Sequence, residues 1–190
     1  ALTEGGRKVA ILSRGYKSVK PPLFQRLKDR IAGKSAINPP RLVTDGKSVL
    51  LDSRTAGDEP YMLASNLRDV VVLVDKDRVK AGRYAVEHFG CDTLLLDDGF
   101  QYWKLAGRRT DVVLIDCQQP FGNEHLLPRG TLREPPRNLR RASHIFLTKC
   151  SAEPNDEIIA RLRQHNRTAS ILECRHRPVY LQNVYEPGDR

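Results

Sequence analysis

Two adjacent carboxylates follow an apolar run near the middle of the chain. Residues 93–101 read TLLLDDGFQ, so Asp97 and Asp98 come directly after three leucines and before a glycine. Short apolar runs are typical of strands covered on both faces, and open α/β sheets bind ligands beyond the carboxyl ends of such strands. Paired carboxylates there suit Mg²⁺ and phosphates bridged by it. An Asp-Asp-Gly turn with solvated carboxylates fits the same letters, and the motif alone leaves both interpretations open.

Strand-like and helix-like segments alternate around this motif. A hairpin is expected over 42–51, and the proline-containing segment 18–40 is interpreted as an insertion or loop. Strands separated by crossover helices predict an α/β fold with a doubly wound, mainly parallel sheet. A modest boundary is expected near 149–154. We expect strands at 7–13, 70–74, 92–96, 111–115, 144–148 and 169–174, and helices within 56–67, 77–89 and 154–164.

Length and composition indicate ordinary α/β material with one substantial core. The chain has 190 residues, of which 39% are hydrophobic, and it contains no apolar run of the roughly 18 residues that a membrane span needs. It begins at Ala1 without a methionine, so we expect that an upstream segment has been removed. The cysteines lie far apart without C-x-x-C spacing, which favours four reduced, mostly buried thiols in a cytosolic protein. They are Cys91, Cys117, Cys150 and Cys174.

The net charge of +9 calls for a partner or a solubility explanation. Nucleic acid, anionic lipid headgroups and phosphorylated substrates are the candidate partners, and a solvated basic face is the plain alternative. Aromatic residues make up only 6% and do not interleave with the basic ones, which disfavours a nucleic-acid stacking platform. The arginines concentrate in the second half: Arg129, Arg133, Arg137, Arg140, Arg141, Arg161, Arg163, Arg167, Arg175 and Arg177.

Two short segments imitate the end of a phosphate loop. Gly33-Lys34-Ser35 and Gly46-Lys47-Ser48 both contain G-K-S, but the motif needs another glycine five residues before the first, where Lys28 and Arg41 stand. Neither segment follows a buried strand. We therefore expect neither to bind a nucleotide.

Four motifs in order distinguish this chain from a generic α/β protein. They are Ser13-Arg14-Gly15-Tyr16, Gly57-Asp58-Glu59-Pro60, Asp97-Asp98-Gly99-Phe100-Gln101 and Leu127-Pro128-Arg129-Gly130-Thr131-Leu132-Arg133-Glu134-Pro135. In this combination the chain resembles the tetraacyldisaccharide 4'-kinase family, from about Arg7 to Lys149 and more weakly beyond.

The resemblance implies a P-loop NTPase-like three-layer α/β/α core with a smaller C-terminal α/β domain. Residues 1–149 would be the kinase core and 150–190 the start of the second domain. The implied activity transfers the γ-phosphoryl of ATP, with Mg²⁺, to the 4'-hydroxyl of a tetraacylated glucosamine disaccharide 1-phosphate in lipid A biosynthesis. The implied place is the anionic cytoplasmic face of the bacterial inner membrane, and no nucleic-acid partner is expected.

The resemblance also assigns roles to acidic residues. Asp58 matches the catalytic residue that helps to deprotonate the sugar hydroxyl, and Glu59 beside it is expected at or near the metal. Both stand at an expected helix start, where the dipole favours negative charge, and simple helix capping is the alternative for Asp58. Asp97 and Asp98 match the carboxylates around Mg²⁺.

Cationic and amide side chains complete the implied site. Arg78 and Arg133 match arginines expected to face phosphate groups, which the guanidinium fork suits. Surface ion pairing is the alternative, more so for Arg78. Gln101 is expected to orient substrate or metal-bound water, and Arg14 to complete the pocket floor.

The chain departs from the family pattern in three places. The phosphate loop and the catalytic histidine are absent from these 190 residues, so we expect the chain alone to be inactive. Tyr102 stands where the family usually has histidine after D-D-G-F-Q, and a tyrosine cannot carry protons near neutral pH. The remaining histidines are interpreted as ordinary surface or turn residues: His88, His125, His144, His165 and His176.

Two other function classes remain open from the residues. A P-loop-type kinase or ATPase acting on a soluble phosphorylated metabolite would use the same carboxylates. A basic nucleic-acid-binding α/β domain would instead bind with steep salt dependence and without need of Asp97 or Asp98.

Overall fold

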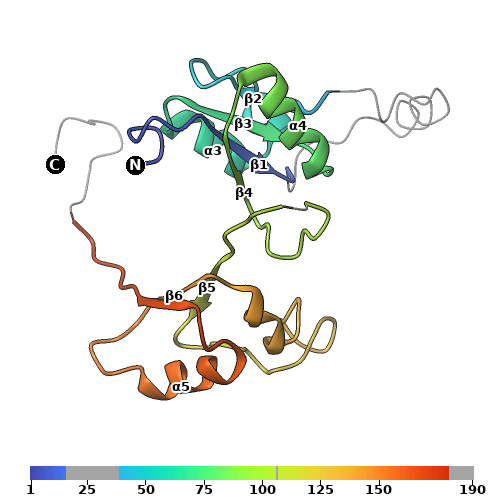
Figure 1. The fold of residues 1–190 in the computed structure, drawn as a ribbon. Coiled ribbons are helices and arrows are strands. Elements are labelled where there is room, and N and C mark those ends of the chain that lie inside the picture. Colours follow the sequence, from blue (N-terminus) through green and yellow to red (C-terminus); the bar gives the residue numbers. More distant parts are fainter. Residues whose placement is uncertain (16–38, 106, 180–190) are drawn as a thin grey trace. The chain divides into compact units, whose positions relative to one another are not determined.

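The computed structural model describes residues 1–15, 39–105 and 107–179 (Figure 1). It divides into two compact units, Ala1–Ala106 and Gly107–Arg190. Each unit combines helices with its own sheet, and the parallel strands confirm the predicted α/β class. Most of the predicted loop at 18–40, and Gly33-Lys34-Ser35 with it, lies outside the described residues.

Unit 1 is built on a four-stranded sheet in the order β2-β3-β1-β4. β1 runs parallel to both β3 and β4, and β2 runs antiparallel to β3. The elements are β1 (Val9–Ser13), β2 (Arg41–Thr44), α2 (Ser53–Ala56), α3 (Asp58–Asn66), β3 (Val70–Val74), α4 (Arg78–Phe89) and β4 (Thr93–Leu96).

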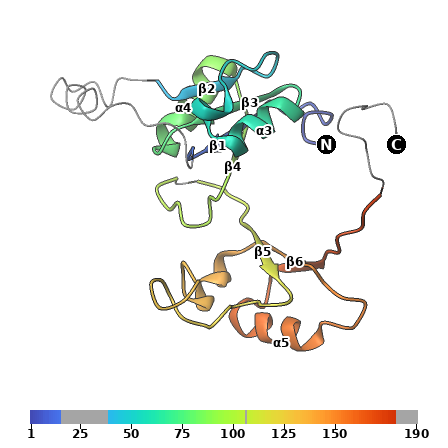
Figure 2. The same cartoon turned by 180° about the vertical axis from the view of Figure 1, so that it is seen from behind.

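Helices cover both faces of this sheet (Figures 1 and 2). Val9 and Ile11 of β1 pack with Ala64 of α3 on one face, and Ala10 and Leu12 pack with α4 on the other. Alternate residues of a strand point to opposite faces, so every residue of β1 and β3 is buried. Unit 1 is therefore a three-layer α/β/α structure, and its apolar runs correctly predicted buried strands.

The decoy at Gly46-Lys47-Ser48 is a turn of the predicted hairpin. The Asp45 carboxylate accepts from the backbone N–H groups of Lys47 and Ser48, both at 2.9 Å, and these bonds hold the pKa of Asp45 below its ordinary value. The two N–H groups that would have to cradle a phosphate are therefore occupied by the chain's own carboxylate.

Unit 2 contains a three-stranded parallel sheet in the order β5-β6-β7. Ile145 and Leu147 of β6 and Leu162 of α5 are fully buried. The buried Asn166 amide donates to the carbonyls of Leu139 and Ala142 at 2.7 and 2.8 Å, which ties the end of α5 to η2. The elements are β5 (Val112–Asp116), η2 (Pro136–Arg141), β6 (His144–Thr148), α5 (Asp156–His165) and β7 (Ser170–Glu173).

The division between the units differs from the boundary expected at 149–150. That position lies inside unit 2, between β6 and α5, and β6 pairs directly with β7 beyond it. Each unit has its own sheet, in the orders β2-β3-β1-β4 and β5-β6-β7. The described part of the link between them contains turns and no helix of the kind that usually joins parallel neighbours. As a domain boundary of a longer protein, 149–150 stays a prediction.

All four cysteines are free thiols. Cys91 and Cys150 are buried, and the Sγ atoms of Cys117 and Cys150 lie 2.8 Å apart at the ends of β5 and β6. Burial and the neighbouring thiol raise the pKa of Cys117 to about 12, so it stays protonated at neutral pH. In the described part of the chain, no helix is long and apolar enough to cross a bilayer.

Candidate active site

The carboxyl ends of β1 and β4 place Ser13 beside Asp97. Leu12 and Leu96 are register partners, and the backbone N–H of Asp97 donates to the Leu12 carbonyl at 3.1 Å. Ser13 is only 3% exposed, and its hydroxyl donates to Asp97 Oδ2 at 2.8 Å. Asp97 therefore lies beyond the end of a parallel strand, as the apolar run predicted, and its carboxylate is held by a buried donor.

The turn that follows gives the second carboxylate a different environment. Asp98 is exposed and adopts a left-handed backbone with φ of 50°. A Cβ on Gly99 would lie 2.5 Å from Leu96 Cβ, so a side chain does not fit there without movement. The Asp-Asp-Gly turn and the carboxylate pair are thus one feature: the turn anchors Asp97 and leaves Asp98 open to solvent.

Arg78 enters the same edge of the sheet from the first position of α4. It is only 4% exposed, and its Nη2 donates to the backbone carbonyl of Asp97 at 3.3 Å. Its Nε is buried and has no hydrogen-bond partner among the described residues. The surface ion pair that was the alternative for this residue is therefore wrong, because the side chain is in the interior.

Burial lowers the pKa of the Arg78 guanidinium, nearby Arg14 lowers it further, and the negative charge of Asp97 opposes both. Arginine nevertheless keeps its proton in proteins, so Arg14 and Arg78 are two cations whose charges repel each other. A buried N–H without an acceptor is costly. An anionic ligand at this edge would satisfy that donor and relieve the repulsion between the arginines.

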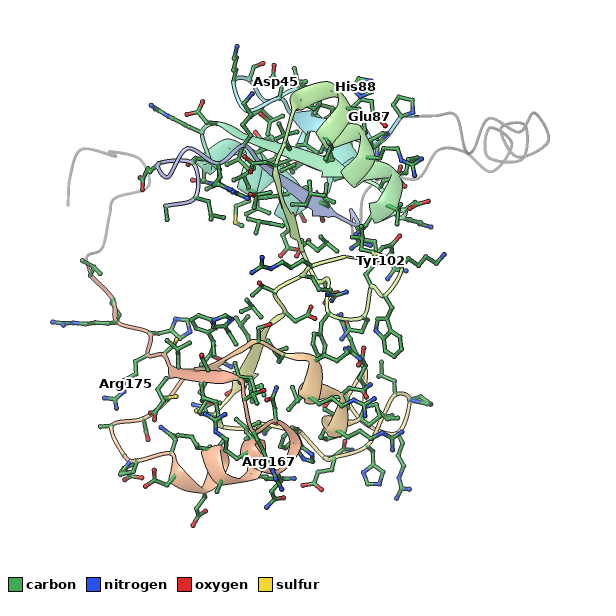
Figure 3. The ribbon with its side chains drawn as sticks, viewed as in Figure 1. Asp45, Glu87, His88, Tyr102, Arg167 and Arg175 are labelled. Atoms are coloured by element: carbon green, nitrogen blue, oxygen red, sulfur yellow. The ribbon has the colours of Figure 1, made fainter. Side chains whose placement is uncertain are left out.

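Tyr102 joins the loop after β4 to the start of α4 (Figure 3). Its hydroxyl accepts from the backbone N–H of Arg78 at 3.1 Å and donates to Asp77 Oδ1 at 3.3 Å. The Arg78 guanidinium carbon lies 5.4 Å from the centre of the Tyr102 ring. The residue that departs from the family pattern therefore contacts an arginine of the predicted site.

Asp58 and Glu59 are the first two residues of α3 and are both exposed. The N-cap is Gly57, with φ of 98°, and no side chain caps the helix. Asp58 is thus not the capping residue that the alternative interpretation required. Arg41, the register partner of Val74 at the carboxyl end of β3, donates to the Thr55 carbonyl just before α3. The start of α3 therefore lies at the same edge of the sheet as Asp97.

The remaining predicted residues are less constrained. Arg14 and Gln101 are exposed, one after β1 and the other after the Asp-Asp-Gly turn. Arg133 is exposed in unit 2, on a loop in which the backbone N–H groups of Leu127 and Leu132 donate to the carbonyls of Leu132 and His125. The structure thus brings Arg78, Asp97 and Arg14 together in unit 1, and Arg133 belongs to the separate unit.

Two partners of the site, Ser13 and Asp77, were given no role from the sequence, and Tyr102 was noted there only as a departure from the family pattern. Asp77 accepts from the backbone N–H groups of Val79 and Lys80, and its pKa is lowered by these bonds and by the Tyr102 hydroxyl. An aspartate before a helical pattern is a recognisable cap signal. The partnership of Tyr102 carries no such local signal.

The donor set limits which metal the site suits. Among the described residues, no three or more His, Cys, Asp or Glu side chains gather into a metal cluster. A dedicated cage is therefore not formed by this part of the chain. Mg²⁺ is commonly held by one or two carboxylates together with waters and substrate phosphates, and Asp97 and Asp98 fit that pattern.

Comparison with known proteins identifies the family to which the chain belongs. The family model of tetraacyldisaccharide-1-P 4'-kinase matches residues 1–189. The chain belongs to the tetraacyldisaccharide 4'-kinase family.

Individual relatives agree with that assignment. A tetraacyldisaccharide 4'-kinase of Anaeromyxobacter dehalogenans is 42% identical over 182 residues, which are 95% of this chain and 43% of the relative. The enzyme of the same name from Halothermothrix orenii is 38% identical over 186 residues, 96% of this chain and 44% of the relative. The chain thus spans less than half the length of these kinases.

A solved structure supports the fold. The "apo" form of LpxK from Aquifex aeolicus, in complex with ATP, superimposes with a TM-score of 0.61 at 22% identity. The match covers 96% of this chain and 67% of that one. It confirms that the chain has the α/β fold of this kinase family.

The hydroxyl of Ser13 should matter for stability because it is buried against a charged group. We expect Ser13→Ala to lower the free energy of unfolding of unit 1 by about 1–3 kcal/mol, since the half-buried Asp97 carboxylate loses a donor. Ser65→Ala is the matched control: its hydroxyl donates to the Tyr61 carbonyl on the exposed side of α3, so a change below about 0.5 kcal/mol is expected. Urea denaturation of both variants measures the difference, and equal small losses would show that the Ser13 bond contributes little.

Proposed function

We propose that this chain forms part of a kinase that phosphorylates the 4'-hydroxyl of a tetraacylated glucosamine disaccharide 1-phosphate with ATP, in lipid A biosynthesis. Family membership over residues 1–189 supports the reaction class. The observation that carries the proposal for this chain's own residues is Arg78, a buried arginine whose Nε lacks an acceptor among the described residues, next to Asp97 and near Arg14.

Each of these groups has a task in phosphoryl transfer. The reaction requires positioning and charge stabilisation more than covalent chemistry by the protein. Arg78 and Arg14 would face phosphate oxygens, and Asp97 and Asp98 would hold Mg²⁺ with Glu59 at or near the metal. Mg²⁺ held there would supply positive charge that offsets the negative charge of the phosphate groups.

Asp58 is the proposed acceptor for the proton of the attacking sugar hydroxyl. It is exposed at the start of α3, where the N-terminal end of the helix favours negative charge. The N-cap of α3 is Gly57, and Asp58 is exposed, so its carboxylate can be reached by a substrate. Gln101, exposed after the Asp-Asp-Gly turn, would orient substrate or metal-bound water.

The lipid nature of the proposed substrate gives the basic residues of unit 2 a task. Arg129, Arg133, Arg137 and Arg140 are exposed in and after the loop that carries the Leu127–Pro135 motif. We propose that Arg133 faces the substrate and that the others contact anionic headgroups at the cytoplasmic face of the inner membrane. Arg141 differs, because it forms an ion pair with Glu134 at 2.9 Å.

The carboxylates can be tested with substitutions that preserve the local structure. In the Asp97→Asn variant the amide oxygen could still accept from Ser13, and asparagine tolerates the left-handed backbone of residue 98. In the protein at the length of its relatives, we expect Asp97→Asn and Asp98→Asn each to lower turnover at least about tenfold with little change in thermal stability.

Asp69→Asn is the matched control for Asp98→Asn. Asp69 is also exposed and left-handed, with φ of 58°, but it precedes β3 at the opposite end of the sheet. The turnover of the Asp69→Asn variant should equal that of the unmodified protein. If both site variants phosphorylated the substrate at the normal rate, the carboxylates would have no part in the reaction.

Asp58 can be separated from a purely helical role by comparison with α5. We expect Asp58→Ala to depress kcat far more than it weakens ATP binding, because the proposed proton transfer belongs to the transition state. Asp156→Ala removes the first acidic residue of α5 and is the control. Each change costs about 0.3–1 kcal/mol of stability through the helix dipole. Comparable stability loss with an intact kcat for Asp58→Ala would reject the catalytic role.

The basic loop should bind membranes through its exposed arginines. Arg137→Gln and Arg140→Gln should each weaken association with anionic vesicles about fivefold at low salt, since each membrane-near cation contributes on the order of 1 kcal/mol. Arg141→Gln removes the same charge but from an ion pair, so it should weaken binding less.

Two further measurements distinguish membrane binding from catalysis. The effect of Arg137→Gln and Arg140→Gln should vanish at high salt and with detergent-solubilised substrate, because screened or absent headgroups leave nothing to bind. Arg133→Gln should lower turnover under both conditions. Vesicle binding that is indifferent to salt and to these arginines would refute the membrane role.

A further inference from the structure

We propose that Tyr102 is a positioning residue for phosphoryl transfer, which acts by fixing the Arg78 guanidinium at the carboxyl edge of the unit 1 sheet. The inference rests on the proposed function for its effect on catalysis. Its structural part, the control of Arg78 by Tyr102, can be measured without any reaction.

Two hydrogen bonds of the Tyr102 hydroxyl stabilise the start of α4. The first N–H groups of a helix lack partners within the helix. Here Tyr102 accepts from the N–H of Arg78, and Asp77 accepts from those of Val79 and Lys80. The hydroxyl also donates to Asp77 Oδ1, so the two capping groups hold each other. The start of α4 is therefore closed by its own chain.

This closure determines which group is left for an anion. A helix N-terminus often binds phosphate through its backbone N–H groups, but those of Arg78, Val79 and Lys80 are already used. The donor that remains is the Arg78 side chain, whose Nε has no partner among the described residues. An anion at this point would thus be bound by the guanidinium, and its affinity depends on how the guanidinium is held.

The ring of Tyr102 supplies that support. The guanidinium carbon lies 5.4 Å from the ring centre, within the range of a cation–π contact. Nη2 also donates to the Asp97 carbonyl, so Arg78 contacts both the ring and the turn that carries the carboxylates. The backbone N–H of Tyr102 donates to the Gly99 carbonyl at 2.9 Å, which fixes the ring to that same turn. Arg78 and Asp97 therefore keep one geometry only while Tyr102 is in place.

The structural part can be tested by nuclear magnetic resonance on the full-length protein labelled with ¹⁵N-arginine. We expect the Arg78 Nε–H signal to report a rigid side chain in the unmodified protein. Tyr102→Leu should make it mobile and remove the ring-current shift, and Tyr102→Phe should keep the shift with partial loss of rigidity. Tyr84→Phe, the same change further along α4, should leave the signal as it was. An unchanged Arg78 signal in both Tyr102 variants would overturn the proposal.

The catalytic part can be tested by kinetics in two backgrounds. We expect Tyr102→Phe to lower kcat about tenfold and to change KM for ATP by less than about threefold, because a misaligned arginine fails mainly in the transition state. In the Arg78→Lys background the same change should have little further effect, since residues that act through one another are not additive. Full additivity would overturn the proposal and indicate a role independent of Arg78.

The two tests fail separately. An Arg78 side chain that loosens in the Tyr102 variants, in a protein without 4'-kinase activity, would remove the proposed function and leave the positioning contact standing. Normal kinase activity together with a rigid Arg78 in every variant would remove the positioning role of Tyr102 and leave the proposed function standing. Thermal unfolding of each variant checks that the protein measured is folded. If Tyr102→Leu does not fold, Tyr102→Phe, which keeps the ring, still tests the proposal.

Discussion

The parallel pairing of β1 with β4 is the constraint on which the site depends. The bond from the Asp97 N–H to the Leu12 carbonyl fixes where β4 ends relative to β1, and the Ser13 hydroxyl then meets the Asp97 carboxylate. A register shift of one residue would turn every side chain of β4 to the other face. Asp97 would then leave Ser13, and its carbonyl would leave Arg78. The position of the acidic pair is thus set by backbone pairing before any side-chain contact is made.

The start of α4 is the second fixed point, and it depends on the first. Arg78 reaches the Asp97 carbonyl only because α4 packs on β1 through Ala81 and Ala85, small residues that let the helix approach the sheet. Burying a charged side chain without full pairing opposes folding. The aliphatic contacts of α4 with Leu12 and Leu73 offset that cost. Unit 1 thereby holds an incompletely satisfied cation, as expected where a binding site is built at the expense of stability.

Local sequence signals predicted the elements well and their assembly less well. The apolar runs at Val70–Val74 and His144–Thr148 match the observed strands residue for residue. A strand that is buried on one or both faces has a recognisable local pattern of apolar residues. The division at residue 106 was not predicted, since pairing between distant strands has no local signature. A surface ion pair was considered more plausible for Arg78 than for Arg133. The burial of Arg78 could not be predicted locally, because it depends on a turn almost twenty residues later in the chain. Tyr102 likewise contacts a helix start far from it in sequence.

The two arginines expected to face phosphate are positioned by different physical means. Arg78 is fixed by a helix, a ring and a strand end, all of which lie within one packed unit. Arg133 follows a loop whose shape is imposed by close backbone contacts: a Cβ on Gly130 would lie 2.2 Å from the His125 carbonyl oxygen, and the Asn123 amide donates to the Arg129 carbonyl. Sterics at one glycine can therefore orient an arginine that stays exposed. The buried cation is thus fixed by packing within unit 1, whereas the exposed one depends on the backbone of its loop.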